Sequence, residues 1–324
     1  MSTLPTKIGK YDVVALIGRA GLGLVYDAVD PDVGRPVVIK AITGPVPLDA
    51  DDVNCFWSEA QPAAGLQHPN IVNIYDAGVH EGNPYMVTEY LDGESLEAAL
   101  KGSRALSLFD KINIAICVCR GLAYAHQCGI AHYGIQPASI VLCNDGMIRI
   151  ADFAIAHAAS QALIRTGDAV GPLSYMAPEQ LELRTTDYRA DIFSMGVVLY
   201  QLISNHHPFE GDSPVSTIFK IMHEPTPSLN TFRNDYAPEI EAVLLRAMAK
   251  NPAERYSSAD DFAFALERLM EHFKDGSARQ ERQDISSPEQ DEVGSPVCSG
   301  YGSRRRRRWP RSISKKRGSM PSKH

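Results

Sequence analysis

The first part of the chain places apolar residues at the spacing of β-strands. "YDVVALIG" and "RPVVIKAI", within residues 11–42, are rich in β-branched residues, and a glycine-rich turn follows the first. Residues 51–67 predict a helix that begins among acidic residues and ends at "QHPN". "IVNIYDAGVHEGNPYMVTEYL" predicts a strand pair around a Gly-Asn-Pro turn. We therefore expect a sheet accompanied by one helix.

After Gly93 the apolar positions follow a helical period. "SLEAALKG" and the long amphipathic "LSLFDKINIAICVCRGLAYAHQCG" predict helices, short strands follow at 140–151, and helices return from 187 to 273. A strand-rich part followed by a helix-rich part predicts an α+β fold with two lobes that join near residues 89–93. The chain shows no internal repeat.

Charge divides the chain into an acidic body and a basic end. From Lys274 onward there are 13 Lys or Arg against 6 Asp or Glu, a balance of +7, whereas residues 1–273 carry 19 against 33, a balance of −14. Residues 274–324 are polar and almost free of aliphatic side chains, so we expect them to be disordered. The basic run at 304–317 predicts either contact with a polyanion, such as nucleic acid or anionic lipid, or simply a solvated end.

Other features restrict the class of protein. No apolar run reaches the roughly 18–20 residues of a membrane span, and the start has no apolar signal segment. The six cysteines form no CxxC pair, which is typical of reduced thiols. We therefore expect a cytoplasmic protein.

Several motifs follow one another between residues 11 and 273. They are "IGRAGLGLVY", "VVIK", "VTEYLDGESL", "HYGIQPASI", "RIADFAIA" and "SYMAPEQ". In this order and spacing they resemble a bacterial-type serine/threonine protein kinase domain. The resemblance implies a bilobal kinase-like fold, with an N-terminal extension at 1–10, an N-lobe at about 11–90, a C-lobe at about 91–273 and the tail at 274–324.

The resemblance also implies a site for ATP and Mg²⁺. Lys40 would contact the phosphates and pair with Glu59, and Asp152 would ligate Mg²⁺. Thr88 would be the small gatekeeper, and backbone groups of Glu89 to Leu91 would meet the adenine. The implied nucleotide-binding set is Ile17, Gly18, Gly21, Gly23, Val25, Val38, Lys40, Glu59, Thr88, Glu89, Leu91 and Val141.

The catalytic loop departs from the family pattern HRDxKPxNI. Gly134 stands where the family has the Asp that accepts the substrate proton, and Gln136 replaces the Lys that steadies the γ-phosphate. Ser139, a shorter oxygen ligand, replaces the Asn that binds a second Mg²⁺, and Tyr133 replaces the Arg that receives an activation-loop phosphate. The threonine that normally bridges the catalytic Asp and Lys is Pro172. The structural anchors implied by the family remain, namely His132, Glu179, Asp191 and Arg255.

Three interpretations follow. The first is a pseudokinase that binds ATP but is catalytically impaired and works in signalling by allostery or docking, with an active kinase or a phosphorylation substrate as its protein partner. The second is an active serine/threonine protein kinase with an atypical site. The third is a nucleotide-free interaction module, because Val38 adds bulk above the adenine and Pro62 interrupts the helix that carries Glu59.

Overall fold

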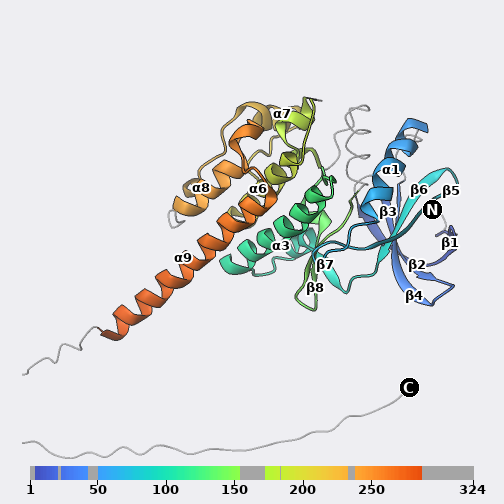
Figure 1. Cartoon of the computed structure of the whole chain (residues 1–324), viewed down its shortest axis with the longest axis horizontal. Helices are drawn as coiled ribbons and strands as arrows, with labels where there is room; N and C mark the ends of the chain where they lie inside the picture. Colours follow the sequence, from blue (N-terminus) through green and yellow to red (C-terminus); the bar gives the residue numbers. More distant parts are fainter. Residues whose placement is uncertain are drawn as a thin grey trace, which may run out of the picture. The chain divides into compact units, whose positions relative to one another are not determined.

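The computed structural model describes residues 4–20, 23–42, 50–153, 172–182, 184–232 and 238–286. The first lobe is an antiparallel sheet with strand order β1-β2-β3-β4-β6-β5, beside which lies helix α1, Ala50–Ala63 (Figure 1). The strands are β1 Lys7–Ile8, β2 Tyr11–Ala20, β3 Gly23–Asp30, β4 Arg35–Ile42, β5 Ile74–His80 and β6 Asn83–Glu89. This confirms the strand-rich first part that the sequence predicts.

The two faces of strand β4 differ in burial. Val37, Ile39 and Ala41 are buried in the small apolar cluster of this lobe. Successive side chains of a strand point to opposite faces, so Val38 and Lys40 lie on the other face, and both are partly buried. The register pairs Val38 with Thr88 of β6. A pattern of period two thus brings the expected nucleotide-binding residues to one face of the sheet.

The second lobe is helical and contains a small antiparallel sheet. Its main helices are α2 Leu96–Lys101, α3 Leu108–Gln127, α5 Pro178–Leu181, α6 Arg189–Ser204, α7 Pro214–His223, α8 Pro238–Ala247 and α9 Ala259–Ser286. The sheet has the order β7-β8-β9, formed by Gly93–Ser95, Ile140–Cys143 and Ile148–Ile150. Short 3₁₀ turns occur at Pro137–Ser139, Pro172–Tyr175, Leu229–Thr231 and Pro252–Glu254. Both lobes belong to one compact unit that ends at Ala278.

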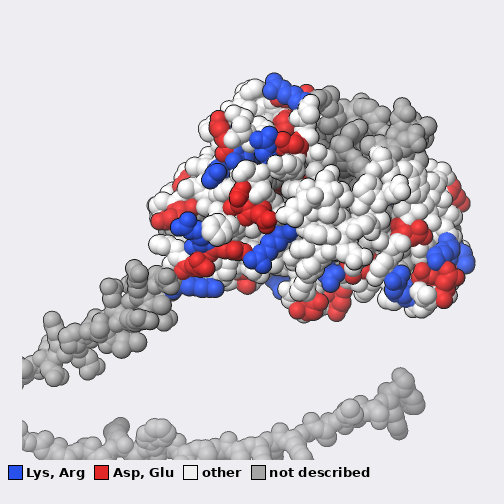
Figure 2. Space-filling model, viewed as in Figure 1, with Lys and Arg blue, Asp and Glu red and all other residues white. Residues whose placement is uncertain are grey.

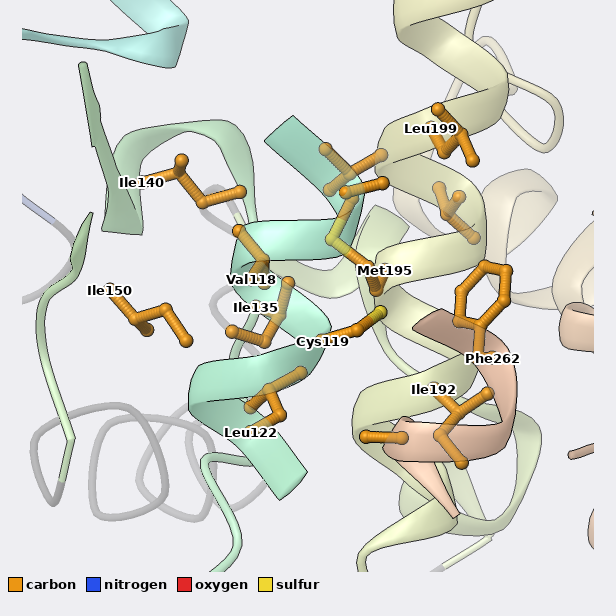
Figure 3. Close-up of a cluster of buried hydrophobic side chains, with 14 of the residues drawn as sticks. Val118, Cys119, Leu122, Ile135, Ile140, Ile150, Ile192, Met195, Leu199 and Phe262 are labelled. Atoms are coloured by element: carbon orange, nitrogen blue, oxygen red, sulfur yellow. The ribbon is translucent and has the colours of Figure 1, made fainter. Parts of the chain in front are cut away.

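Helix α6 is the centre of the second lobe. Nearly every residue from Ala190 to Ser204 is buried, and its apolar side chains meet those of α3 and α9 (Figure 3). The contact residues labelled there include Val118, Cys119, Leu122, Ile192, Met195, Leu199 and Phe262. Helix α3 begins at a capping box in which Ser107 and Asp110 satisfy each other's backbone N–H groups. This packed core is the rigid support for the loop between α3 and β8.

Two helix ends differ from the sequence-based expectation. The helix expected to end near residue 67 ends at Ala63, because the N–H groups of Gly65 and Leu66 bond to the carbonyls of Pro62 and Ala63, three residues back, in a tighter turn than that of an α-helix. Helix α9 continues to Ser286, although we expected disorder from Lys274. Residues 274–286 contain Ala, Arg, Gln and Glu, which favour helix. The rest of the expected tail, with the basic run, lies outside the described residues.

The surface mixes both signs of charge. On the face drawn in Figure 2, acidic and basic side chains are interspersed, and no continuous area of one sign stands out. Within the described residues, no helix is long and apolar enough to cross a membrane.

Candidate functional site

The loop between α3 and β8 is held by one buried carboxylate. Asp191 lies in the first turn of α6 and is fully buried. Its oxygens accept hydrogen bonds from the backbone N–H groups of His132 (2.8 Å) and Tyr133 (2.7 Å). His126 Nε2 lies 2.8 Å from the same carboxylate. These contacts hold Tyr133 in the left-handed region at φ 59°, which costs a non-glycine residue roughly 1–3 kcal/mol.

Asp191 is ionised in its buried position. Burial disfavours the charged carboxylate, but the hydrogen bond and attraction from His126 and the hydrogen bond from the backbone N–H of His132 outweigh burial. The pKa of Asp191 is therefore lower than its ordinary value. The carboxylate thus acts as a permanent acceptor that fixes the start of the loop.

His132 links this loop to the segment after β9. A carbonyl oxygen only accepts, so Nε2 carries the proton in the 2.8 Å hydrogen bond to the carbonyl of Ala151. The N–H of Gly134 donates to Nδ1 over 3.2 Å, so the imidazole is neutral. Burial agrees with this, since it lowers the pKa of His132. The ring also packs edge-on against Phe153, with centroids 4.6 Å apart.

The hydroxyl of Ser139 is used inside the loop. It donates to the carbonyl of Gln136 over 2.9 Å and accepts the N–H of Gln136 over 3.1 Å. Its own carbonyl accepts from the N–H of Ala151, and only 1% of the residue is exposed. The sequence suggests Ser139 as a shorter metal ligand, but in the structure its hydroxyl closes the 3₁₀ turn.

Lys40 and Asp152 form a direct ion pair across the two lobes. Lys40 comes from β4 and Asp152 follows β9, and their side chains are 16% and 15% exposed. Asp152 has φ 73°, so the chain turns sharply at this residue. Glu59 lies on α1, but its side chain is outside the described residues, as are Gly21 and the residue after Phe153. The observed partner of Lys40 is therefore the expected metal ligand.

The remaining predicted nucleotide-binding residues differ in how far they are exposed to solvent. Thr88 is buried, whereas Gly18, Val25, Val38, Leu91 and Val141 are partly buried. Ile17 is 56% exposed at the end of the sheet near the glycine-rich turn. Gly23 is a buried residue at the start of β3.

Glu89 is fixed by two residues that sequence reasoning missed. Its carboxylate accepts from Arg149 of β9 over 2.6 Å and from the backbone and side-chain amides of Asn73 over 2.8 and 3.1 Å. The Arg149–Glu89 pair is partly buried and joins the segment between the lobes to the second lobe. The two residues are 60 positions apart, and no local spacing signals such a contact.

A buried ion pair anchors α5 to the segment before α9. Arg255 donates to both oxygens of Glu179, over 2.6 and 2.8 Å. It also donates to the carbonyls of Ala249, Arg189 and Lys250. Arg255 is 3% exposed and Glu179 is 7% exposed. The guanidinium thereby satisfies the acid and three backbone carbonyls at once, as expected of a planar fork of donors.

Comparison with known protein families shows which family the chain belongs to. The model of the protein kinase domain matches residues 11–272. The chain belongs to this family. It is 34% identical over 270 residues to the serine/threonine-protein kinase PrkC of Bacillus subtilis, covering 81% of this chain and 42% of that protein. It is also 34% identical over 267 residues to PknA of Mycobacterium tuberculosis, covering 81% of this chain and 61% of that protein.

Solved kinase domains agree with the fold. The crystal structure of the Mycobacterium tuberculosis PknI kinase domain has a TM-score of 0.69 and 29% identity, covering 82% of this chain and 99% of that chain. A probable serine/threonine-protein kinase of Streptomyces coelicolor is 34% identical over 270 residues, which is 40% of its length. The chain spans from two fifths to about three fifths of these curated relatives. The bacterial-type kinase fold expected from the motifs is thus confirmed.

Few side chains at this site could ligate a metal ion. Within the described residues, no group of three or more His, Cys, Asp or Glu side chains is arranged to hold a metal ion. Asp152 offers one carboxylate, Ser139 is engaged in its own turn, and residues 130–142 contain no acid. Among the residues that the structure describes, the donors therefore fit one Mg²⁺ through Asp152 and do not fit a pair of ions.

Removing the Ser139 hydroxyl is expected to destabilise the kinase domain. Ser139→Ala leaves the partly buried N–H of Gln136 without its acceptor, whereas the Gln136 carbonyl keeps the backbone N–H of Ser139; the expected cost is about 1–3 kcal/mol. Urea unfolding followed by circular dichroism measures the difference. Ser257→Ala, at an exposed serine that bonds Asp261, is the control and should change stability by less than about 0.5 kcal/mol. Equal effects of the two variants would contradict the assigned role of Ser139.

Acid is expected to destabilise the kinase domain through His207. This ring packs edge-on against Tyr175 at 5.0 Å, and burial lowers its pKa from 6.5 to about 4. Below pH 6.5 the unfolded chain binds a proton that the folded domain takes up only near pH 4. The free energy of unfolding therefore falls across this window, by on the order of 3 kcal/mol. Urea titrations between pH 7 and 4 measure the slope.

Two variants test whether this slope belongs to His207. His207→Gln removes one titrating group and is expected to reduce the slope, while buried His132, whose pKa is also lowered, keeps its own contribution. His223→Gln, at an exposed histidine of α7, should leave the slope unchanged. A slope in His207→Gln as steep as that of the wild type would show that His207 does not contribute.

Proposed function

We propose that this kinase domain binds ATP but transfers the γ-phosphoryl group very slowly, and acts in signalling as a pseudokinase through contact with other proteins. The observation that carries the proposal is the catalytic loop. Its frame is held by Asp191 and His132, while Gly134 and Gln136 supply neither an acceptor for the substrate proton nor a positive charge. Loss of a general base alone reduces the rate roughly 10²–10⁴-fold.

ATP binding is supported by what the first lobe retains. The segment from Glu89 to Leu91, whose backbone would meet the adenine, is held in place by Arg149 and Asn73, and the N–H of Glu89 donates to the carbonyl of Asn73. Lys40 lies on the face of β4 that carries Val38, beside Asp152. When bound, Mg²⁺ would supply charge neutralisation at the β- and γ-phosphates, and Asp152 is the residue to hold it.

Two measurements test the proposal. The first is transfer of radiolabelled phosphate from ATP to a generic protein substrate, with Asp152→Asn as the background control. Signal clearly above that control would favour the second candidate, an active kinase with an atypical site, which the names of the relatives support. The second is the thermal shift with millimolar ATP for the wild type and Lys40→Met. Absence of any shift in the wild type would leave the nucleotide-free interaction module.

A further inference from the structure

The carboxylate of Glu89 joins three segments that lie far apart in the sequence. Its Oε1 atom accepts from Arg149 Nη1 over 2.6 Å, and from the backbone N–H and the side-chain amide of Asn73 over 2.8 and 3.1 Å. In return, the N–H of Glu89 donates to the carbonyl of Asn73 over 3.0 Å. We call these three residues the inter-lobe clamp, because they hold the chain at the point where β6 ends.

The inter-lobe clamp is shielded from water. The side chains of Arg149 and Glu89 are 20% and 15% exposed. Hydrogen bonds between ionised groups are strong where little water competes, whereas exposed ion pairs contribute little. The clamp therefore restrains Glu89 more firmly than an ion pair on the surface would.

Backbone hydrogen bonds tie the same segments together. The N–H of Ile150 donates to the carbonyl of Asn70 over 2.8 Å, and the N–H of Val72 donates to the carbonyl of Ile150 over 2.9 Å. The chain just before β5 is therefore fixed along β9, and Arg149 extends from β9 to Glu89. The start of the segment between the lobes is thus attached to a rigid support.

From these contacts we infer that Arg149 is a positioning residue for nucleotide binding, which acts through Glu89 to hold the segment from Glu89 to Leu91 in the arrangement that meets the adenine. This inference rests on the proposed ATP binding. A segment that is already ordered loses little freedom when a ligand binds, so the clamp raises affinity. A segment that adopts the binding arrangement only about one fifth of the time would bind about fivefold more weakly.

The first experiment removes the charge of Arg149. Arg149→Met keeps the aliphatic part of the side chain, and isothermal titration of the full chain measures binding of ATP in excess MgCl₂ and of adenosine. Both dissociation constants are expected to rise by the same factor, at least about fivefold, because the two ligands share the adenine.

The other outcomes of this titration separate the inference from the proposed function. A loss for ATP alone would place the effect at the phosphates and would overturn the inference. Unchanged affinities for both ligands would also overturn it, while leaving the proposed ATP binding intact. A wild type that binds no ATP would overturn both.

Two further variants show whether Arg149 acts through Glu89. Arg149→Lys retains a positively charged donor and is expected to recover most of the lost affinity. In a chain that carries Glu89→Met, the change Arg149→Met is expected to cause no further loss, because its partner is already absent. Losses that simply add would show that Arg149 acts by another route, contrary to the inference.

Arg104→Met is the matched control. It also removes a guanidinium from an ion pair with a glutamate, but that pair is exposed, so both affinities should stay unchanged. A loss as large as that of Arg149→Met would contradict a specific role for Arg149. The melting temperature of each unliganded variant verifies that it is folded.

Glu89→Gln is used if Arg149→Met does not fold. It keeps the shape of the side chain and removes the charge that strengthens the bond from Arg149. Both dissociation constants are then expected to rise at least about twofold. Affinities equal to those of the wild type would overturn the inference.

Discussion

Replacing Arg255 with methionine is expected to lower the free energy of unfolding of the kinase domain by roughly 3–5 kcal/mol. The change removes both hydrogen bonds to Glu179 and leaves a charged carboxylate buried without a partner. It also deprives the carbonyls of Ala249 and Arg189 of a donor. For a domain of this size the loss corresponds to a decrease of roughly 10 °C in melting temperature, which scanning calorimetry measures.

Two further variants separate the buried ion pair from a general effect of losing an arginine. Arg104→Met breaks an exposed pair with Glu94, whose side chains are 51% and 43% accessible, so it should cost at most about 1 kcal/mol. The double variant Arg255→Met with Glu179→Met removes the unpaired charge and is expected to recover a large part of the lost stability. A double variant as unstable as Arg255→Met alone would contradict this explanation.

Rebuilding the catalytic loop is expected to raise the phosphotransfer rate at least 100-fold, because a positioned general base alone contributes about 10²–10⁴. The variant combines Gly134→Asp, Gln136→Lys and Ser139→Asn. The three changes belong together because groups that act on one transferring phosphate do not contribute additively. Steady-state transfer of radiolabelled phosphate, relative to the wild type, is the measurement.

The controls show whether the gain is chemical. Adding Asp152→Asn to the rebuilt loop should remove the gain, and Gln136→Lys alone should give little of it. Because Pro172 stands where the family has a bridging threonine, a fourth change, Pro172→Thr, completes the set. A folded, ATP-binding chain that gains no rate with all four changes would show that these positions do not limit the reaction.

Local pattern predicted the fold well. Strand periodicity in β3 and β4 and helical periodicity in α3 and α6 are properties of short stretches, and they place the core on the correct faces. The errors lie at helix ends, where single residues decide. A tight turn at Gly65 ends α1 early, and the favourable residues after Lys274 allow α9 to continue.

The sequence predicted which residues belong to the candidate site, but not which of them contact one another. The motifs identify Asp191 and His132. That Asp191 accepts hydrogen bonds from two backbone N–H groups, however, depends on how α6 packs against the loop. Likewise, Ser139 reads as an available oxygen in the sequence, and only the 3₁₀ turn shows that its hydroxyl is already bonded. Side-chain direction is set by the packing around each residue, and a linear pattern does not contain it.

The sequence by itself determined the two-lobed kinase architecture, the retained anchors and the absence of the usual acid, lysine and asparagine from the catalytic loop. The tertiary structure alone decided which charges meet. Lys40 pairs with Asp152 across 112 positions, and Glu89 pairs with Arg149 across 60. Such contacts form because the cores of the two lobes bring distant segments together, so their partners depend on the folded packing and not on local residue preference.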